Sequence, residues 1–137
     1  MLNLKNKKRG FIQRKAAAAV ELAVCLPVIV ILALGSMEAA SMIFLRQALV
    51  QSAYETVKEA ARAQGSEALA LTRSREVLAF RDIQGETVTI VPAGTEALDR
   101  GTEITVTISA PGDTNSIFPF GPFRNREVSV SATMVKE

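Results

Sequence analysis

Histidine and tryptophan are absent from this chain of 137 residues, and cysteine and tyrosine occur once each. The single cysteine, Cys25, lies inside an apolar run, so no intrachain disulfide can form and no Cys/His metal site can be built. The sequence also lacks a glycine-rich phosphate loop and any spacing typical of metal ligands. The usual tools of catalysis are therefore scarce. We expect the chain not to be an enzyme, and to need no cofactor, metal or small-molecule substrate.

Charge is distributed unevenly along the chain. The first fifteen residues contain six basic residues and no acidic one, whereas the rest of the chain has ten basic and fourteen acidic residues, a net charge of −4. A basic tail beside a long apolar run is typical of the cytoplasmic flank of a membrane segment. The overall charge of +2 therefore does not indicate nucleic-acid binding. The six basic residues are Lys5, Lys7, Lys8, Arg9, Arg14 and Lys15.

The apolar run extends from Leu22 to Leu45 and is interrupted by one charge, Glu38. As a helix it would be about 36 Å long, enough to cross a hydrocarbon core of about 30 Å. We therefore predict that residues 22–45 span the inner membrane of a bacterium. Because the basic leader precedes the run, the N-terminus is expected in the cytoplasm and the C-terminal part outside it.

The helical pattern does not stop where the apolar run ends. It continues without Gly or Pro to Gln64, and Gly65 is a suitable stop. We predict one long helix over 17–64, whose projecting part carries an apolar stripe that needs a partner, either its own domain or a neighbouring helix. A cleavable secretory signal is the alternative, since Ala39 and Ser41 form a weak small-x-small pattern. The stripe consists of Leu45, Leu49, Ala53, Val57 and Ala60.

Residues 65–137 are predicted to form a small extracytoplasmic domain. Ser66 is positioned to cap a short helix ending near Phe80, whose Leu69, Val77 and Phe80 are expected to face a sheet. Three runs around residues 87–90, 104–108 and 128–134 alternate apolar residues with Thr or Ser, which indicates strands buried on one face. The predicted fold class is α+β: a long N-terminal transmembrane and projecting helix, a short helix, and a three-stranded antiparallel sheet.

The segment 110–126 holds three phenylalanines among prolines and glycines, which exclude regular structure. It either covers the open end of the core or presents an aromatic patch to a protein partner. Contact with lipid is less expected, because the projecting helix would hold the segment about 30 Å from the bilayer. The three residues are Phe118, Phe120 and Phe123.

The stretch RKAAAAVEL at 14–22 resembles the processing site of type IV prepilins, where a peptidase removes a basic leader and leaves glutamate as the fifth residue. A cut between Ala16 and Ala17 would put Glu21 at that place and define 1–16 as the leader. More widely, residues 14–64 resemble the TadE-like family of the tight-adherence (Tad) pilus and secretion systems. The matching features are the Ala-rich entry, Val20-Glu21, Leu26-Pro27, Gly35 with Glu38, and Arg46-Gln47-Ala48-Leu49. The residue before the expected cut is Ala16, where glycine is usual.

This resemblance implies a minor pilin or pseudopilin that acts by assembly in biogenesis of a Tad pilus, with a link to cell adhesion and secretion. The implied partners are other pilin-like subunits, the Tad assembly machinery, prepilin peptidase and the lipid bilayer. Two alternatives stay open. One is a signal-anchored envelope domain that binds a soluble protein, and the other is a secreted β-domain released by signal peptidase.

Several residues of the apolar run are candidates for helix assembly. Cleavage would create an α-amine one turn before Glu21, so this carboxylate could pair with its own or a neighbour's amine. Pro27 removes one helical hydrogen bond and favours a bend. Gly35 and Ala39 form a small-xxx-small pair that allows close helix approach, and Glu38 lies on the same turn.

Overall fold

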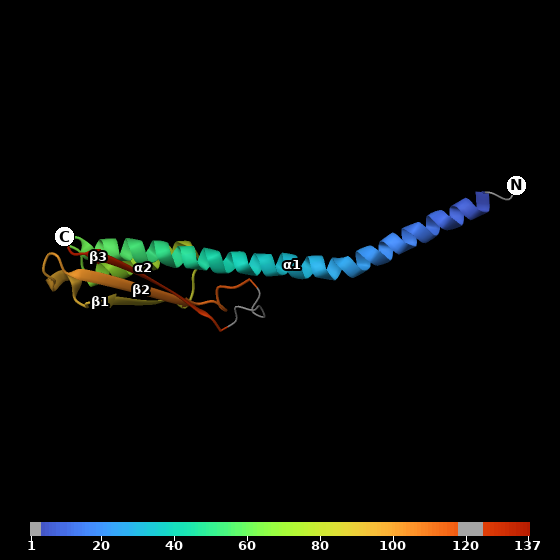
Figure 1. The fold of residues 1–137 in the computed structure, drawn as a ribbon. Coiled ribbons are helices and arrows are strands. Elements are labelled where there is room, and N and C mark those ends of the chain that lie inside the picture. The colour runs from blue at the N-terminus through green and yellow to red at the C-terminus, as the bar shows by residue number, and fades with distance from the viewer. Residues whose placement is uncertain (1–3, 118–124) are drawn as a thin grey trace. The chain divides into compact units, whose positions relative to one another are not determined.

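The structure is a computed structural model that describes residues 4–117 and 125–137. Its contacts divide the chain into two units, Met1–Met37 and Glu38–Glu137. The first helix, α1, covers Leu4–Ala61 and continues through Pro27, so it begins in the first unit and ends in the second (Figure 1). The predicted long N-terminal helix is confirmed; α1 begins at Leu4, before the predicted start at residue 17, and ends at Ala61, three residues before the predicted end at 64.

In the first unit, the apolar side chains of α1 have no protein around them. Leu22 is 61% exposed, Ile31 is 69% exposed and Leu32 is 65% exposed. Among the described residues, α1 is long enough and apolar enough to cross a membrane, and its apolar stretch is not buried. In water such a surface would be unfavourable by about 25 cal/mol per Å². The first unit is therefore compatible with a single-pass membrane anchor.

The second unit begins inside the segment 22–45 that hydropathy assigned to the membrane. Glu38 is 2% exposed and Leu45 is 1% exposed, both against residues of the C-terminal domain. Apolar side chains that face lipid and those that face a protein core have the same hydropathy. The composition of the run therefore could not show where the change of surroundings occurs.

The remaining elements form the predicted α+β domain. They are α2 (Glu67–Phe80), β1 (Thr87–Val91), the short 3-10 helix η1 (Thr95–Ala97), β2 (Glu103–Pro111) and β3 (Glu127–Val135). The strands form an antiparallel sheet in the order β1-β2-β3. Thr105 and Thr133 share a hydroxyl hydrogen bond of 2.9 Å across β2 and β3. The Thr and Ser residues of the alternating runs thus occupy the outer face of the sheet, as predicted.

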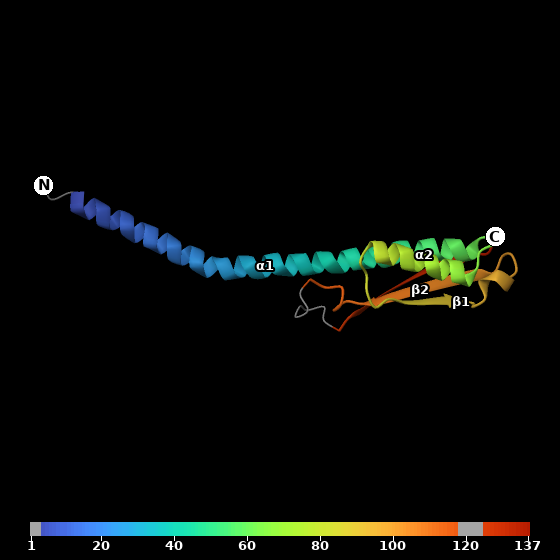
Figure 2. The same ribbon diagram turned by 180° about the vertical axis from the view of Figure 1, so that it is seen from behind.

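The core lies between the inner face of this sheet and two helices. Figures 1 and 2 show α2 and the C-terminal part of α1 side by side over one face of the sheet. All members of the predicted stripe on α1 are buried, and they pack with the sheet residues Ile90, Ile104, Val106 and Ile108. The stripe therefore takes its own domain as its partner. The members are Leu45, Leu49, Ala53, Val57 and Ala60.

The predicted inner face of α2 is wrong. Leu69 is 54% exposed and Phe80 is 89% exposed, whereas the buried residues are Ala70, Ser74 and Leu78. The reason is steric: α2 packs against α1 as well as the sheet, and the hydroxyls of Ser52 and Ser74 meet at 3.0 Å. Small residues permit this close approach, and of the three buried residues of α2 only Leu78 is large and apolar. Ser66 is the N-cap as predicted, accepting a hydrogen bond from the amide of Leu69.

The C-terminal end of α1 is closed by groups that are distant in sequence. Gly65 follows the helix so closely that an added Cβ would lie 2.0 Å from the carbonyl oxygen of Glu59. The ammonium of Lys136, a residue only 4% exposed, donates hydrogen bonds to the carbonyls of Ala60, Arg62 and Gly65 at 3.1, 2.7 and 3.4 Å. A cation at this place satisfies free carbonyls and opposes the negative end of the helix dipole.

Candidate functional site

The residues at the predicted processing site lie within the exposed part of α1. Ala16, Ala17 and Glu21 are all exposed and helical. Within the described residues the carboxylate of Glu21 makes no hydrogen bond or ion pair. Such a group in an apolar stretch is costly in lipid, by about 2.5–3.5 kcal/mol at the bilayer centre on insertion scales. Its position in the apolar stretch therefore indicates a partner outside the described residues.

Pro27 and Gly35, which were predicted to take part in helix assembly, are also exposed. A Cβ added to Gly35 would have nothing within 4 Å. No packing among the described residues therefore requires glycine there, and its small surface is exposed. Ala39, its predicted small-residue partner, belongs to the second unit and is partly buried. These candidates do not form one site.

Glu38 is placed differently from Glu21. Its side chain is 2% exposed, and the hydroxyl of Ser116 donates a hydrogen bond to its Oε1. Ser116 lies 78 residues away in the segment between β2 and β3. The carboxylate therefore fastens this segment to α1 inside one unit. Buried carboxylates need such donors, because desolvation without a hydrogen bond is unfavourable.

The described start of the segment between β2 and β3 is well ordered by side-chain contacts. Asn115 accepts a hydrogen bond from the amide of Gln84 at 2.9 Å and donates to the carbonyls of Gln84 and Pro111 at 3.0 and 2.8 Å. The amide of Gly112 donates to the carbonyl of Arg126 at 2.7 Å. Of this segment, Ser116 is held at Glu38, the first residue of the second unit.

Phe118, Phe120 and Phe123 lie outside the described residues, so the predicted partner-contact patch stays a prediction.

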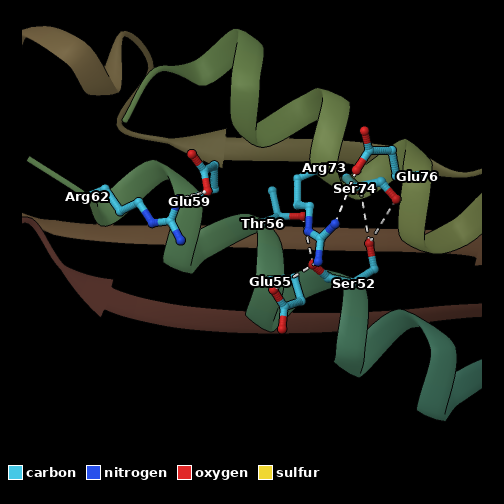
Figure 3. A network of polar contacts seen from close by, with 8 residues as sticks. All are labelled: Ser52, Glu55, Thr56, Glu59, Arg62, Arg73, Ser74 and Glu76. Atoms are coloured by element: carbon cyan, nitrogen blue, oxygen red, sulfur yellow. Dashed lines mark hydrogen bonds and ion pairs between the residues drawn. The ribbon is translucent and has the colours of Figure 1, made fainter. Parts of the chain in front are cut away.

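Polar contacts join α1 to α2 (Figure 3). Thr56 donates to the carbonyl of Ser52 at 2.7 Å, and Ser52 meets Ser74. The guanidinium of Arg73 lies 3.6 Å from Glu55 and 3.2 Å from Glu76. Exposed ion pairs of this kind contribute about 0–1 kcal/mol each. The arrangement fixes two helices and offers no reactive group.

Glu59 and Arg62, three residues apart near the end of α1, form an ion pair with 2.7 Å between a carboxylate oxygen and a guanidinium nitrogen.

Two carboxylates, those of Glu67 and Glu96, lie near the start of α2. The carboxylate of Glu67 accepts from the amide of Gly94 at 2.7 Å, and that of Glu96 accepts from the amide of Glu67 at 3.4 Å. Hydrogen bonds from backbone amides, its own first and then that of Glu67, lower the pKa of Glu96, and the charge of Lys136 adds to this while burial opposes it. The reciprocal contacts tie the turn before η1 to the start of α2. Among the described residues no group of three acidic or cysteine side chains is arranged to hold a metal ion.

Sequence reasoning missed Ser116 and Lys136. Ser116 lies in a turn-rich segment without periodicity, and Lys136 follows an alternating strand as an ordinary polar residue. Their partners are 78 and more than 70 residues away. No local pattern identifies either of them, although an isolated glutamate in an apolar run does signal that some donor must exist.

The fold and these surfaces together define a class of protein: an exposed apolar helix compatible with a membrane anchor, continued by a small α+β domain that buries the rest of the same helix. The chain is TadE-like over residues 16–62, where the family model described as TadE-like protein matches it. The resemblance noted from the sequence is thereby confirmed, and at family level it implies involvement in the Tad pilus system. Neither the comparison with curated proteins nor that with solved structures found a match.

Proposed function

We propose that this chain is a minor pilin or pseudopilin of a Tad pilus, anchored in the bacterial inner membrane by the first part of α1. Its N-terminus lies in the cytoplasm and its α+β domain outside it. The chain acts by assembling with other pilin-like subunits and the Tad machinery, and not by catalysis. The observation that carries this proposal is the coincidence of the TadE-like region, residues 16–62, with the helix whose apolar N-terminal part is left uncovered.

Processing by prepilin peptidase between Ala16 and Ala17 belongs to the same proposal. The cut would free the uncovered helix from its basic leader and leave Glu21 as the fifth residue. Because Glu21 is exposed and without a partner in the described chain, the new α-amine of this or a neighbouring subunit is a suitable partner for it. In a low-dielectric bundle the pair would favour one register of the helices over others.

The two alternatives make different use of the helix. A signal-anchored envelope domain would keep Met1 and use α1 only as an anchor. A secreted β-domain would begin near Met42. The burial of Glu38 in the second unit weighs against the secreted form, since a cut near Met42 would remove Glu38 from the contact with Ser116.

The N-terminal residue of the chain in cell membranes tests the proposal. Ala17 is the expected first residue, whereas Met1 on all of the protein would contradict processing and a first residue near Met42 would contradict the membrane anchor. Co-purification then tests assembly: Glu21→Ala should enter the membrane normally but lose pilin-like partners. Cys25→Ala is the matched control, because it changes another exposed residue one turn further along the same helix. Retention of partners by Glu21→Ala would contradict the role of this carboxylate.

A further inference from the structure

The second unit carries exposed apolar residues on two segments near its first residue, Glu38. Ile43 is 58% exposed and Phe44 is 64% exposed, both on α1, and Ile117 is 54% exposed in the segment after β2. Exposed aromatic and branched apolar residues are unfavourable in water, and groups of them mark surfaces of interaction. These residues come from two segments distant in sequence, which the hydrogen bond of Ser116 to Glu38 brings together in the folded domain.

These exposed apolar residues lie close to the start of the second unit. Glu38 directly follows Met37, the last residue of the uncovered apolar stretch. Ser116 is hydrogen-bonded to Glu38, so Ile117 is one residue from a group that contacts the start of the unit. Along α1, Ile43 and Phe44 follow Glu38 by about 8–9 Å. The headgroup region on each side of the hydrocarbon core is about 5–8 Å thick. With the hydrocarbon core ending near Met37, as the proposed anchor implies, Ile43 and Phe44 lie within reach of this region, and so does Ile117 through the contact of Ser116 with Glu38.

Two arginines lie in one surface hollow with Ile43. Arg46 and Arg126 line one surface hollow together with Met42, Ile43 and Val128, and Glu127 and Ser129 complete it. Within residues 16–117 and 125–137 neither guanidinium is in an ion pair. Arginine at the edge of an apolar surface is suited to lipid phosphates, which it can bind through two hydrogen bonds.

We propose that this end of the domain rests on the extracytoplasmic surface of the bilayer that anchors the chain. We call it the membrane-proximal edge and define it as Ile43, Phe44, Arg46, Ile117 and Arg126. Its apolar side chains enter the interface, and its arginines bind phosphates of anionic lipid headgroups. The proposal rests on the membrane anchoring stated under Proposed function. It assigns to the domain a lipid surface, which fixes how the domain stands on the membrane before any subunit joins it.

The absence of tryptophan from the chain permits a direct test. Ile117→Trp places a single fluorophore at the membrane-proximal edge, and Phe44→Trp is an independent reporter from the other segment. Val91→Trp is the matched control, because Val91 is 59% exposed and its register with Thr105 puts it at the opposite end of β1 from Thr87, which pairs with Ser109. Each full-length variant is reconstituted into vesicles of phosphatidylcholine with phosphatidylglycerol, with or without bromine on the lipid chains near the headgroup.

Ile117→Trp and Phe44→Trp should emit at shorter wavelength than Val91→Trp and should be quenched at least twofold by the brominated lipid, with Val91→Trp unquenched. Equal quenching at both ends of the sheet, or none at the membrane-proximal edge, would overturn the proposal. If this edge binds a protein instead, its fluorophores will stay in a water-like environment in vesicles that contain this chain alone.

The arginines are tested by replacing both with glutamine in the Ile117→Trp background. Each basic residue near an anionic surface adds to an electrostatic attraction that salt screens. The ratio of domains whose membrane-proximal edge is bound to lipid to domains whose edge is free should therefore fall about fivefold for each arginine replaced. The fall should be absent in vesicles of phosphatidylcholine alone. Arg75→Gln, an exposed arginine on α2, should change nothing. An identical loss from Arg75→Gln would show a general charge effect and would contradict a role for Arg46 and Arg126.

Flotation of the vesicles separates this proposal from the proposed anchor. A chain that does not float with the vesicles has no membrane anchor, and the proposed function fails. A chain that floats but leaves Ile117→Trp and Phe44→Trp unquenched keeps its anchor, and only the membrane-proximal edge is refuted.

Discussion

The two parts of α1 differ in what surrounds them although they form one helix. Before Glu38, apolar side chains are exposed on all sides, and Glu21 has no partner among the described residues. From Glu38 onward one stripe is fully buried, and Glu38 itself is covered and hydrogen-bonded. The hydrophobic effect acts on both parts, but among the described residues only the second part buries its apolar side chains against the rest of the protein. The first part depends on lipid or on other helices.

The largest effect expected from this difference follows from shortening a leucine in each part. Leu49→Ala removes a side chain that is 0% exposed and should lower the free energy of unfolding of the domain by about 2–5 kcal/mol, through lost burial and the cavity left behind. Leu32→Ala makes the same change where leucine is 65% exposed and should leave that free energy unchanged. Pulse proteolysis by thermolysin in urea, with the full chain in detergent micelles, measures both. Equal effects would contradict the division at Glu38.

The C-terminal end of α1 should give the next largest effect. Lys136→Met keeps the length of the side chain but leaves the carbonyls of Ala60, Arg62 and Gly65 without their donor. Because unsatisfied buried acceptors are unfavourable, the domain should lose about 2–3 kcal/mol. Lys58→Met is the control, since Lys58 is in the last turn of the helix but exposed. In the same proteolysis assay, an unchanged midpoint for Lys136→Met would show that water replaces the ammonium without loss.

Replacing the two glutamates compares the two parts directly. Glu38→Ala removes the acceptor of Ser116 from a buried position and should destabilise the domain by about 1–2 kcal/mol. Glu21→Ala should leave the stability of the domain unchanged and alter only the association of helices. Urea midpoints of the full-length variants in micelles measure the first effect. A destabilised domain in Glu21→Ala would mean that this carboxylate has a structural role in the isolated chain.

Much of the fold was accessible from the sequence because period and capping act locally. Alternation located all three strands, the residues around Ser66 and Gly65 located the helix ends, and the 3.6-residue period identified the buried stripe on α1. The face of α2 was not accessible, since it is formed by Ala70 and Ser74, whose small size is the reason for the packing. The boundary at Glu38 was hidden because lipid and protein cores select the same side chains.

The candidate site was only partly accessible for a related reason. A glutamate in an apolar run signals that a partner is needed, but it does not tell whether the partner is in the same chain. For Glu38 the donor, Ser116, is brought close only by the turn between β2 and β3. For Glu21 the described chain supplies none. The same residue type in the same helix therefore has two different roles, and only tertiary structure distinguishes them.

The smallest expected effect concerns Glu96, a carboxylate that lies on the surface of the second unit. Backbone amide hydrogen bonds, its own first and then that of Glu67, lower its pKa below the ordinary value of 4.5. A carboxylate with a lower pKa in the folded state binds fewer protons than in the unfolded state, so its contribution to stability is complete above about pH 4.5 and is lost as the pH falls through the lowered value. Because the group is exposed, the contribution is small.

Glu96→Gln should therefore destabilise the domain slightly at pH 7, and the difference from the unchanged chain should disappear as the pH falls below 4.5. Urea unfolding followed by circular dichroism between pH 3 and 7 measures this difference. Glu103→Gln, an exposed glutamate at the start of β2, is the control and should not show it. A difference that persists at pH 3 would mean that Glu96 acts through its shape and not its charge. The contact between η1 and the start of α2 would then depend on the shape of the side chain, and its hydrogen bonds would not need a charged acceptor.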